Sequence, residues 1–123
     1  MKPIVLDYKQ DPELFNETAK EWAENVCSKR GNDCGVKSSQ LRNFYDKVLE
    51  LYDKTEKDSV PWEDVLPFVK MLNSKVAYAK TRKTVNDEFV SMMTQCIKQV
   101  DTSEKLRMFK LFFEAVIGFY PKK

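Results

Sequence analysis

One basic segment of the chain combines cations with an aromatic side chain at helical spacing. Between Pro67 and Asn86 there is no acidic residue. At ~100° per residue on a helix, Arg82 lies about 20° from Lys75, and Tyr78 lies about 60° from it. A row of cations attracts phosphates, and an exposed tyrosine offers a face on which a nucleic-acid base can stack. The row therefore suits a polyanion such as RNA, although the charges alone favour the simpler interpretation of a solvated helix face.

Three further cations are candidates for the same chemistry. Lys80 should lie on the outer face of the helix that carries the row. Lys83 would point along the buried stripe if that helix continued, so we expect the helix to end near Arg82. Arg42 lies near the N-terminal end of another helix, where free backbone N–H groups also favour anions.

The sequence contains no arrangement that suits catalysis. Histidine is absent, which removes the commonest general base and the commonest zinc ligand. The adjacent acids Glu63-Asp64 and Asp87-Glu88 stand at predicted helix starts, where the helix macrodipole accounts for them. Adjacent helical residues also point in different directions, so neither pair converges on a substrate. We expect no catalytic residue, no metal site and no cofactor.

The cysteines and the hydropathy indicate the cellular compartment in which the protein acts. Cys27, Cys34 and Cys96 are odd in number and lack the spacing of a metal knuckle. No secretory signal precedes them, and no apolar run approaches membrane-spanning length. We therefore expect three free thiols in a reduced, cytoplasmic protein with no membrane contact.

The elements that must carry these residues are helices. The chain has 123 residues, 42% hydrophobic, with only three glycines, which favours long helices over many hairpins. We predict an all-α, single-domain bundle of about five helices spanning residues 1–123. The predicted helices cover residues 11–26, 38–53, 62–82, 86–100 and 103–120.

Capping residues, a proline and the spacing of apolar residues predict several details of these helices. Asp11-Pro12-Glu13 should open the first helix, Ser38 or Ser39 should cap the second, Thr84 or Asn86 should begin the fourth, and Ser103 should cap the last. Pro67 predicts a kink or a restart in the third helix. The buried stripe predicted for that helix is Phe68, Leu72, Val76 and Ala79.

The last helix has an unusually wide apolar face. Its apolar residues spread over roughly half its circumference, more than the narrow stripe of a typical surface helix. The simpler interpretation is a central helix surrounded by its own domain. The alternative is that part of the face, Leu111 and Phe119 in particular, contacts a partner subunit.

Three blocks of the sequence together resemble a known family. They are Ser39-Gln40-Leu41-Arg42-Asn43-Phe44-Tyr45, then Leu72 followed by Lys75-Val76-Ala77-Tyr78-Ala79-Lys80-Thr81-Arg82, and finally Phe113-Glu114-Ala115-Val116-Ile117-Gly118-Phe119-Tyr120. In this order and spacing they resemble the small helical subunit of type III-A CRISPR effector (Csm) complexes, over residues 37–122. Thr81 departs from the family pattern, which often has glycine there, and Pro121 stands near a position often occupied by histidine.

The resemblance implies a non-catalytic subunit of an antiviral defence complex. In that family several copies line the guide RNA and target RNA beside other Csm subunits, and contact the backbone without reading sequence. Its implied partners are therefore guide and target RNA, other Csm subunits and further copies of itself. Carried over by position, the RNA-binding residues are first Arg42, Lys75 and Arg82, then Tyr78, Lys80 and Lys83, and finally Lys37.

Other classes of protein fit parts of the sequence. A helical protein–protein adaptor would need the lysines only for solubility. A helix-turn-helix DNA-binding regulator fits poorly, because residues 31–37 are too long for the tight turn and no recognition helix follows. An enzyme fits worst, since no converging acid, base and nucleophile can be named.

Overall fold

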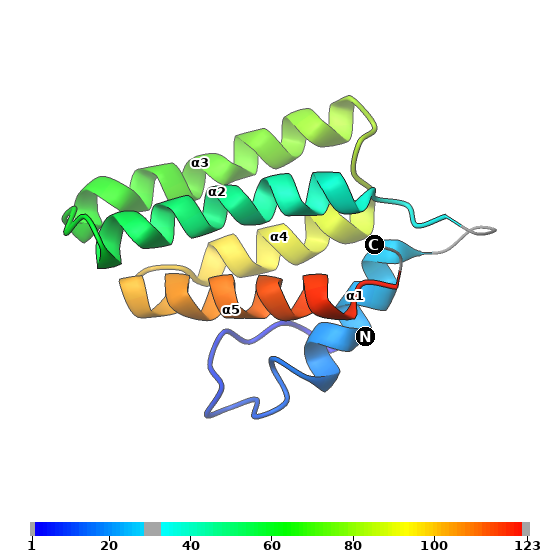
Figure 1. The fold of residues 1–123 in the computed structure, drawn as a ribbon, viewed down its shortest axis with the longest axis horizontal. Coiled ribbons are helices and arrows are strands. Elements are labelled where there is room, and N and C mark those ends of the chain that lie inside the picture. The colour runs from blue at the N-terminus through cyan, green and yellow to red at the C-terminus, as the bar shows by residue number, and fades with distance from the viewer. Residues whose placement is uncertain (1, 29–32, 122–123) are drawn as a thin grey trace.

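The computed structural model describes residues 2–28 and 33–121, and within them it confirms the all-α fold (Figure 1). Helices are the only regular elements of these two segments. Their bounds are α1 (Glu17–Cys27), α2 (Ser38–Glu56), α3 (Trp62–Thr81), α4 (Asp87–Gln99) and α5 (Ser103–Phe119). No helix of this part of the chain is long and apolar enough to cross a membrane.

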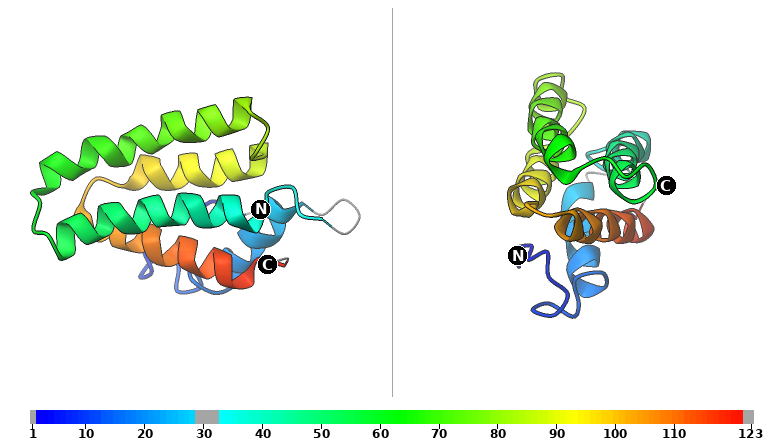
Figure 2. Two further views of the ribbon diagram at one scale, coloured as in Figure 1. Left: turned by 45° about the horizontal axis from the view of Figure 1, so that its top comes forward. Right: turned by 90° about the vertical axis from the view of Figure 1, so that its left-hand side faces the viewer.

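The helices stack so that α1 and α3 lie on opposite sides of the molecule. Consecutive helices α2 and α3 form a hairpin along one side, and α3 also packs on α4 (Figures 1 and 2). Helix α5 packs against α2, α1 and α4, as expected for a central helix, whereas Phe119 at its end is 37% exposed. The N-terminal segment and α1 cover the far side of α5 and α4.

The core is built around aromatic side chains of three helices. Phe89 of α4 lies between Phe44 of α2 and Phe113 of α5, with ring centroids 5.2 and 6.4 Å away. Phe113 also contacts Tyr45 and Phe109, at 5.8 and 6.2 Å. Edge-to-face and offset packing of this kind fixes the relative rotation of helices as well as burying area. The cluster therefore sets the position of α2 relative to α5.

The first helix begins later than its sequence predicts. It starts at Glu17, because residues 12–16 after Asp11 form a turn instead of the first turns of the helix. The buried Asp11 carboxylate accepts hydrogen bonds from the Thr18 hydroxyl (2.7 Å), the Glu13 backbone N–H (3.0 Å) and the Lys2 ammonium (3.0 Å). Burial alone would raise the pKa of Asp11, but these hydrogen bonds and the Lys2 charge outweigh it and lower the pKa.

Helix α3 is continuous, and one residue of its predicted stripe was wrong. It neither stops nor restarts at Pro67, which is exposed and lies in the second turn, where only one backbone hydrogen bond is lost. Phe68 is 56% exposed, whereas Val65 and Val69 are buried beside the correctly predicted Leu72, Val76 and Ala79. The spacing of this set matches one helix face, and Phe68 lies about 100° away from Val69.

Helix starts were predicted with mixed success. Asn86 caps α4 as expected, accepting from the Phe89 backbone N–H at 2.9 Å. Thr102, rather than Ser103, caps α5 by accepting from Lys105. Neither Ser38 nor Ser39 caps α2, because the helix already includes both and the N-cap position is Lys37. The exact cap position depends on local backbone angles, and neighbouring polar residues can cap a helix almost equally well. The sequence therefore does not decide between them.

The expectation of three free thiols was wrong for two of them. Cys27 and Cys34 form a disulfide, with Cα atoms 4.3 Å apart. Helix α1 ends at Cys27, and the chain returns so that the Gly35 backbone N–H donates to the Cys27 carbonyl, which places the two sulfurs side by side. Cys96 is free and buried in α4, and burial raises the pKa of its thiol.

Candidate nucleic-acid interface

A groove between α2 and α3 brings together the basic row predicted from the sequence. Its volume is 690 Å³. Lys75, Tyr78 and Arg82 line it from α3, and Lys47 lines it from α2. Among the described residues, none of the ion pairs involves Lys47, Lys75 or Arg82. We call this feature the α2–α3 groove.

Tyr78 and Arg82 act as a unit in the groove. The Arg82 guanidinium donates to the Tyr78 hydroxyl at 3.2 Å, and its Cζ lies 5.7 Å from the ring centroid. Tyr78 is nevertheless 64% exposed, the largest exposure of any large apolar or aromatic side chain in the described segments. The arginine therefore steadies a ring that stays available for stacking by a base.

The groove is less purely basic than the segment that supplies it. Asp46 and Glu50 of α2 also line it, facing the α3 cations. Along the chain the basic row has no acidic neighbour, but the hairpin brings these carboxylates from about thirty residues away. They reduce the net positive charge of the groove and leave Lys75, Arg82 and Lys47 as its phosphate-binding groups.

Lys37 and Lys83 line a second hollow, of 750 Å³, that adjoins the groove. The two spaces share Gln40 and Thr84, whose side chains hydrogen-bond to each other at 3.3 Å. The basic surface therefore continues from α3 to the start of α2. Five of the seven sequence-predicted residues lie along it: Lys37, Lys75, Tyr78, Arg82 and Lys83.

The remaining two candidates lie elsewhere. Arg42 sits on the α5 side of α2, beside Ile117 and 5.8 Å from the ring of Tyr45. Lys80 faces α4, where Asp87 pairs with it at 2.6 Å. The structure therefore does not bring Arg42 or Lys80 to the α2–α3 groove.

The surroundings of Arg42 are structural. The Tyr45 hydroxyl donates to Glu114 at 3.0 Å, and Lys110 pairs with the same carboxylate at 3.3 Å. Burial, together with the hydrogen bond and charge of Glu114, raises the pKa of Tyr45 to about 12. Glu114 therefore has a structural role, as the acceptor for the Tyr45 hydroxyl and the ion-pair partner of Lys110.

Sequence reasoning missed Lys47. Its neighbours on α2 are acidic, so no charge pattern marks it. The available signal was its position one helical turn from both Phe44 and Leu51, at the edge of the apolar stripe of a helix that had to pack beside α3. Only the pairing of the two helices places it opposite Lys75.

Lys83 holds an unusual backbone conformation at the end of α3. Its φ is 61°, in the left-handed region. The Thr84 N–H donates to the Ala79 carbonyl and the Lys83 N–H to the Lys80 carbonyl, both at 3.0 Å, which is the Schellman pattern of helix termination. Lysine, not glycine, occupies the left-handed position, so this helix end is strained.

We expect Lys83→Gly to raise the free energy of unfolding by about 0.5–1 kcal/mol, because glycine adopts positive φ without a Cβ clash. Urea denaturation at neutral pH measures it. Lys83→Ala serves as the control, since it removes the same charge but keeps the Cβ. Equal stabilities of the glycine and alanine variants would contradict the strain.

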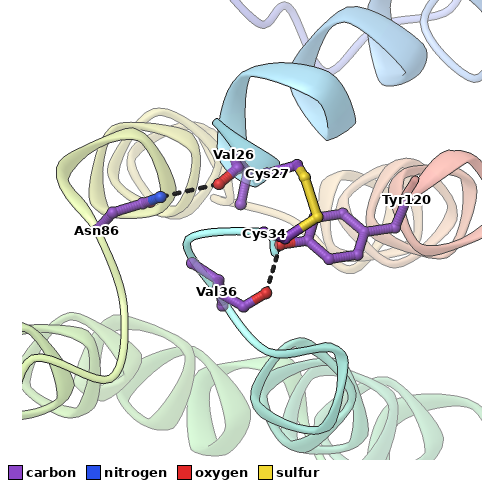
Figure 3. Close-up of a disulfide and its surroundings, with 6 residues drawn as sticks. All are labelled: Val26, Cys27, Cys34, Val36, Asn86 and Tyr120. Atoms are coloured by element: carbon purple, nitrogen blue, oxygen red, sulfur yellow. Dashed lines mark hydrogen bonds between the residues drawn. A yellow bond between two sulfur atoms is a disulfide. The ribbon is translucent and has the colours of Figure 1, made fainter. Parts of the chain in front are cut away.

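Two contacts hold the loop that precedes α2, and a third fixes the end of α1 beside it (Figure 3). The disulfide joins the loop to α1, and the Tyr120 hydroxyl donates to the Val36 carbonyl. The Asn86 side chain donates to the carbonyl of Val26 in α1 at 2.8 Å. Burial raises the pKa of Tyr120 to about 12, so its hydroxyl keeps the donated proton at neutral pH. These contacts hold the start of α2, and with it one end of the basic surface.

Comparison with known proteins identifies the family. No curated protein and no solved structure gives a significant match to the chain. One family model does, Csm2 Type III-A, and it matches residues 9–122. The match extends the resemblance beyond residues 37–122 to include α1 and the turn before it. The chain therefore belongs to the Csm2 family, the small helical subunits of type III-A CRISPR-Cas effector complexes.

Proposed function

We propose that this protein is a non-catalytic, RNA-lining subunit of a type III-A effector complex in the cytoplasm, acting in antiviral defence. Its partners are guide and target RNA, other Csm subunits and further copies of itself, and residues 1–123 act as one domain. The observation that carries the proposal is the convergence of Lys47, Lys75, Tyr78 and Arg82 on one groove of a family member.

The groove suits contact with a strand rather than readout of its sequence. Lysine and arginine neutralise phosphates, and an aromatic ring stacks on any base. Sequence recognition is left to pairing between guide and target strands. Contact with about three phosphates gives weak binding per copy, so useful affinity comes from several copies on one strand.

A fluorescence-anisotropy titration with single-stranded RNA of about 40 nucleotides tests this function. With about three phosphate contacts, affinity should fall roughly 20-fold between 50 and 200 mM salt. The Lys47→Ala, Lys75→Ala, Arg82→Ala variant should bind at least tenfold more weakly at the lower salt concentration, with little remaining salt dependence.

The matched control removes three exposed lysines outside the groove: Lys9→Ala, Lys20→Ala, Lys98→Ala. It has the same net charge as the groove variant and should retain most of the wild-type affinity. Equal loss in both variants would reject the groove in favour of general charge attraction. Separate measurement of Arg42→Ala decides whether the α5 side of α2 also contacts RNA.

The adaptor function remains a second candidate because two large apolar side chains, Phe68 and Met71, are 56% and 45% exposed on α3. An adaptor would show no RNA binding at any salt concentration. It would also be insensitive to loss of the groove cations.

A further inference from the structure

A disulfide borders the basic surface at the point where the chain enters α2 (Figure 3). Cys27 ends α1, and Cys34, which is bonded to it, lies shortly before the first residue of α2. Cys34 also lines the 750 Å³ hollow that contains Lys37 and Lys83. The bridge is therefore part of the wall of that hollow, and opening it changes how the wall is held.

The two sulfurs of the bridge differ in accessibility. Cys27 is 1% exposed, whereas Cys34 is half-buried and lines the hollow. Thiol–disulfide exchange begins with attack by a thiolate, and the positive charges of Lys37 and Lys83 attract such an anion into the hollow. The arrangement therefore directs an incoming thiolate to the sulfur of Cys34.

The start of α2 depends on the chain that precedes it. Its N-cap residue, Lys37, makes no capping hydrogen bond through its side chain within the described part of the chain. A helix end without such a cap leaves backbone N–H groups unsatisfied and frays more readily. The bridge at Cys34 is one tie on this segment, and the hydrogen bond from Tyr120 to Val36 is the other. Loss of the bridge leaves α2 attached at Val36 but loosens the residues around Lys37.

A disulfide is unusual in a protein that acts in the cytoplasm. Thiol reductants keep most cytoplasmic cysteines reduced, and the disulfides that do form there are usually transient, catalytic or redox-sensing. The spacing is not that of a catalytic Cys-x-x-Cys pair, because Cys27 and Cys34 are seven residues apart. Compartment and spacing together favour redox sensing.

We propose that the Cys27–Cys34 bond is a reversible redox switch, which fixes the start of α2 when it is formed and releases it when it is reduced. The inference rests on the proposed RNA function and assigns a regulation to one end of its surface. The oxidised protein binds RNA more tightly, because Lys37 is then held beside Lys83. The groove cations are unaffected, so the difference is modest, about threefold to fivefold.

Reduction is a two-electron exchange with a dithiol. One thiolate of the dithiol attacks the Cys34 sulfur, the S–S bond breaks, and Cys27 leaves as a thiolate that takes up a proton. The second thiolate of the dithiol then attacks the mixed disulfide, so that Cys34 leaves and is protonated while the reductant becomes a disulfide. Two molecules of glutathione do the same, and oxidised glutathione drives the reverse reaction.

Equilibration of the protein in glutathione buffers of graded ratio tests whether the bond is reversible. After acid quenching and unfolding, alkylation and peptide mass spectrometry give the reduced fraction of each cysteine. Cys27 and Cys34 should become reactive together as reduced glutathione increases, and lose reactivity when oxidised glutathione is restored. Cys96, which is alkylated at every ratio, is the internal reference. A bond that stays closed at every ratio, or that does not form again, would overturn the proposal.

Hydrogen–deuterium exchange of the oxidised and reduced proteins tests the release of the start of α2. The Gly35 N–H, which donates to the Cys27 carbonyl, and the first turn of α2 should exchange at least about threefold faster after reduction. The middle of α5 should not change, and circular dichroism should show equal helix content. Equal exchange at residues 34–41, or unfolding of the whole protein on reduction, would argue against a local switch.

RNA titrations at low salt test the effect on binding. The oxidised wild type should bind about threefold to fivefold more tightly than the reduced wild type. Cys27→Ser, Cys34→Ser should match the reduced protein with and without a dithiol. Lys37→Ala, Lys83→Ala should bind more weakly and lose the dependence on redox state.

The outcomes separate the switch from the RNA function on which it rests. Equal RNA affinities of the oxidised and reduced wild type would reject the regulation and leave the RNA function standing. A redox dependence that persists in Lys37→Ala, Lys83→Ala would reject the assigned end of the surface. Faster exchange on reduction without RNA binding in either state would contradict the RNA function and still support the release of α2.

Discussion

Truncating Phe113 to alanine should lower the free energy of unfolding by about 3–5 kcal/mol, the usual cost of deleting a buried phenylalanine ring. Phe113 is fully buried and contacts the rings of Tyr45, Phe89 and Phe109. Its loss leaves a cavity where α2, α4 and α5 meet. Urea or thermal denaturation followed by far-ultraviolet circular dichroism measures the change.

Phe119 on the same helix provides the matched control. It is 37% exposed, so Phe119→Ala removes the same ring from a position that is partly in water. We expect its cost to stay below about 1 kcal/mol. Similar losses in both variants would show that the aromatic cluster around Phe113 is not the centre of the core.

Breaking the Cys27–Cys34 disulfide should lower the free energy of unfolding by about 2.5 kcal/mol. The bridge joins residues seven apart in sequence. Closing a loop of this length lowers the conformational entropy of the unfolded chain, which stabilises the folded state by about 2.5 kcal/mol. Without the bridge, the Tyr120 hydrogen bond still holds the loop and the Asn86 hydrogen bond still holds the end of α1. We therefore expect the native fold to persist in the reduced protein, with lower stability.

Denaturation with and without a dithiol reductant measures this effect. The Cys27→Ser, Cys34→Ser variant is the control, because it should match the reduced wild type and gain nothing from the reductant. Cys96 is buried away from the bridge and stays a thiol in both proteins. A wild type whose stability does not change on reduction would contradict a stabilising bridge.

Much of the fold could be predicted from local patterns. Apolar spacing located all five helices, and Asn86 was identified as a cap because its side chain and the Phe89 N–H are close in sequence. Asp11 does accept from the backbone N–H of Glu13, but residues 12–16 form a turn instead of a helix, and the carboxylate is also held by the more distant Thr18 and Lys2. Phe68 was misplaced because α2 and α4 together decide which face of α3 is covered.

The residues of the candidate site also divide into those that local spacing could place and those that only tertiary packing places. Lys75, Tyr78 and Arg82 share one helix, so helical spacing was enough to place them together. Lys47, Asp46 and Glu50 come from a different helix, and no pattern along the chain indicates that they oppose that row.

The sequence by itself determined the helical class, the basic row and the family resemblance, because each depends on residues close together in the chain. Tertiary structure alone decided that Cys27 meets Cys34, that Lys47 lies opposite Lys75, and that Arg42 and Lys80 face away from the groove. The physical reason is that packing of helices distant in sequence sets these relations. Periodicity fixes how side chains are arranged around each helix, but not which neighbour covers them.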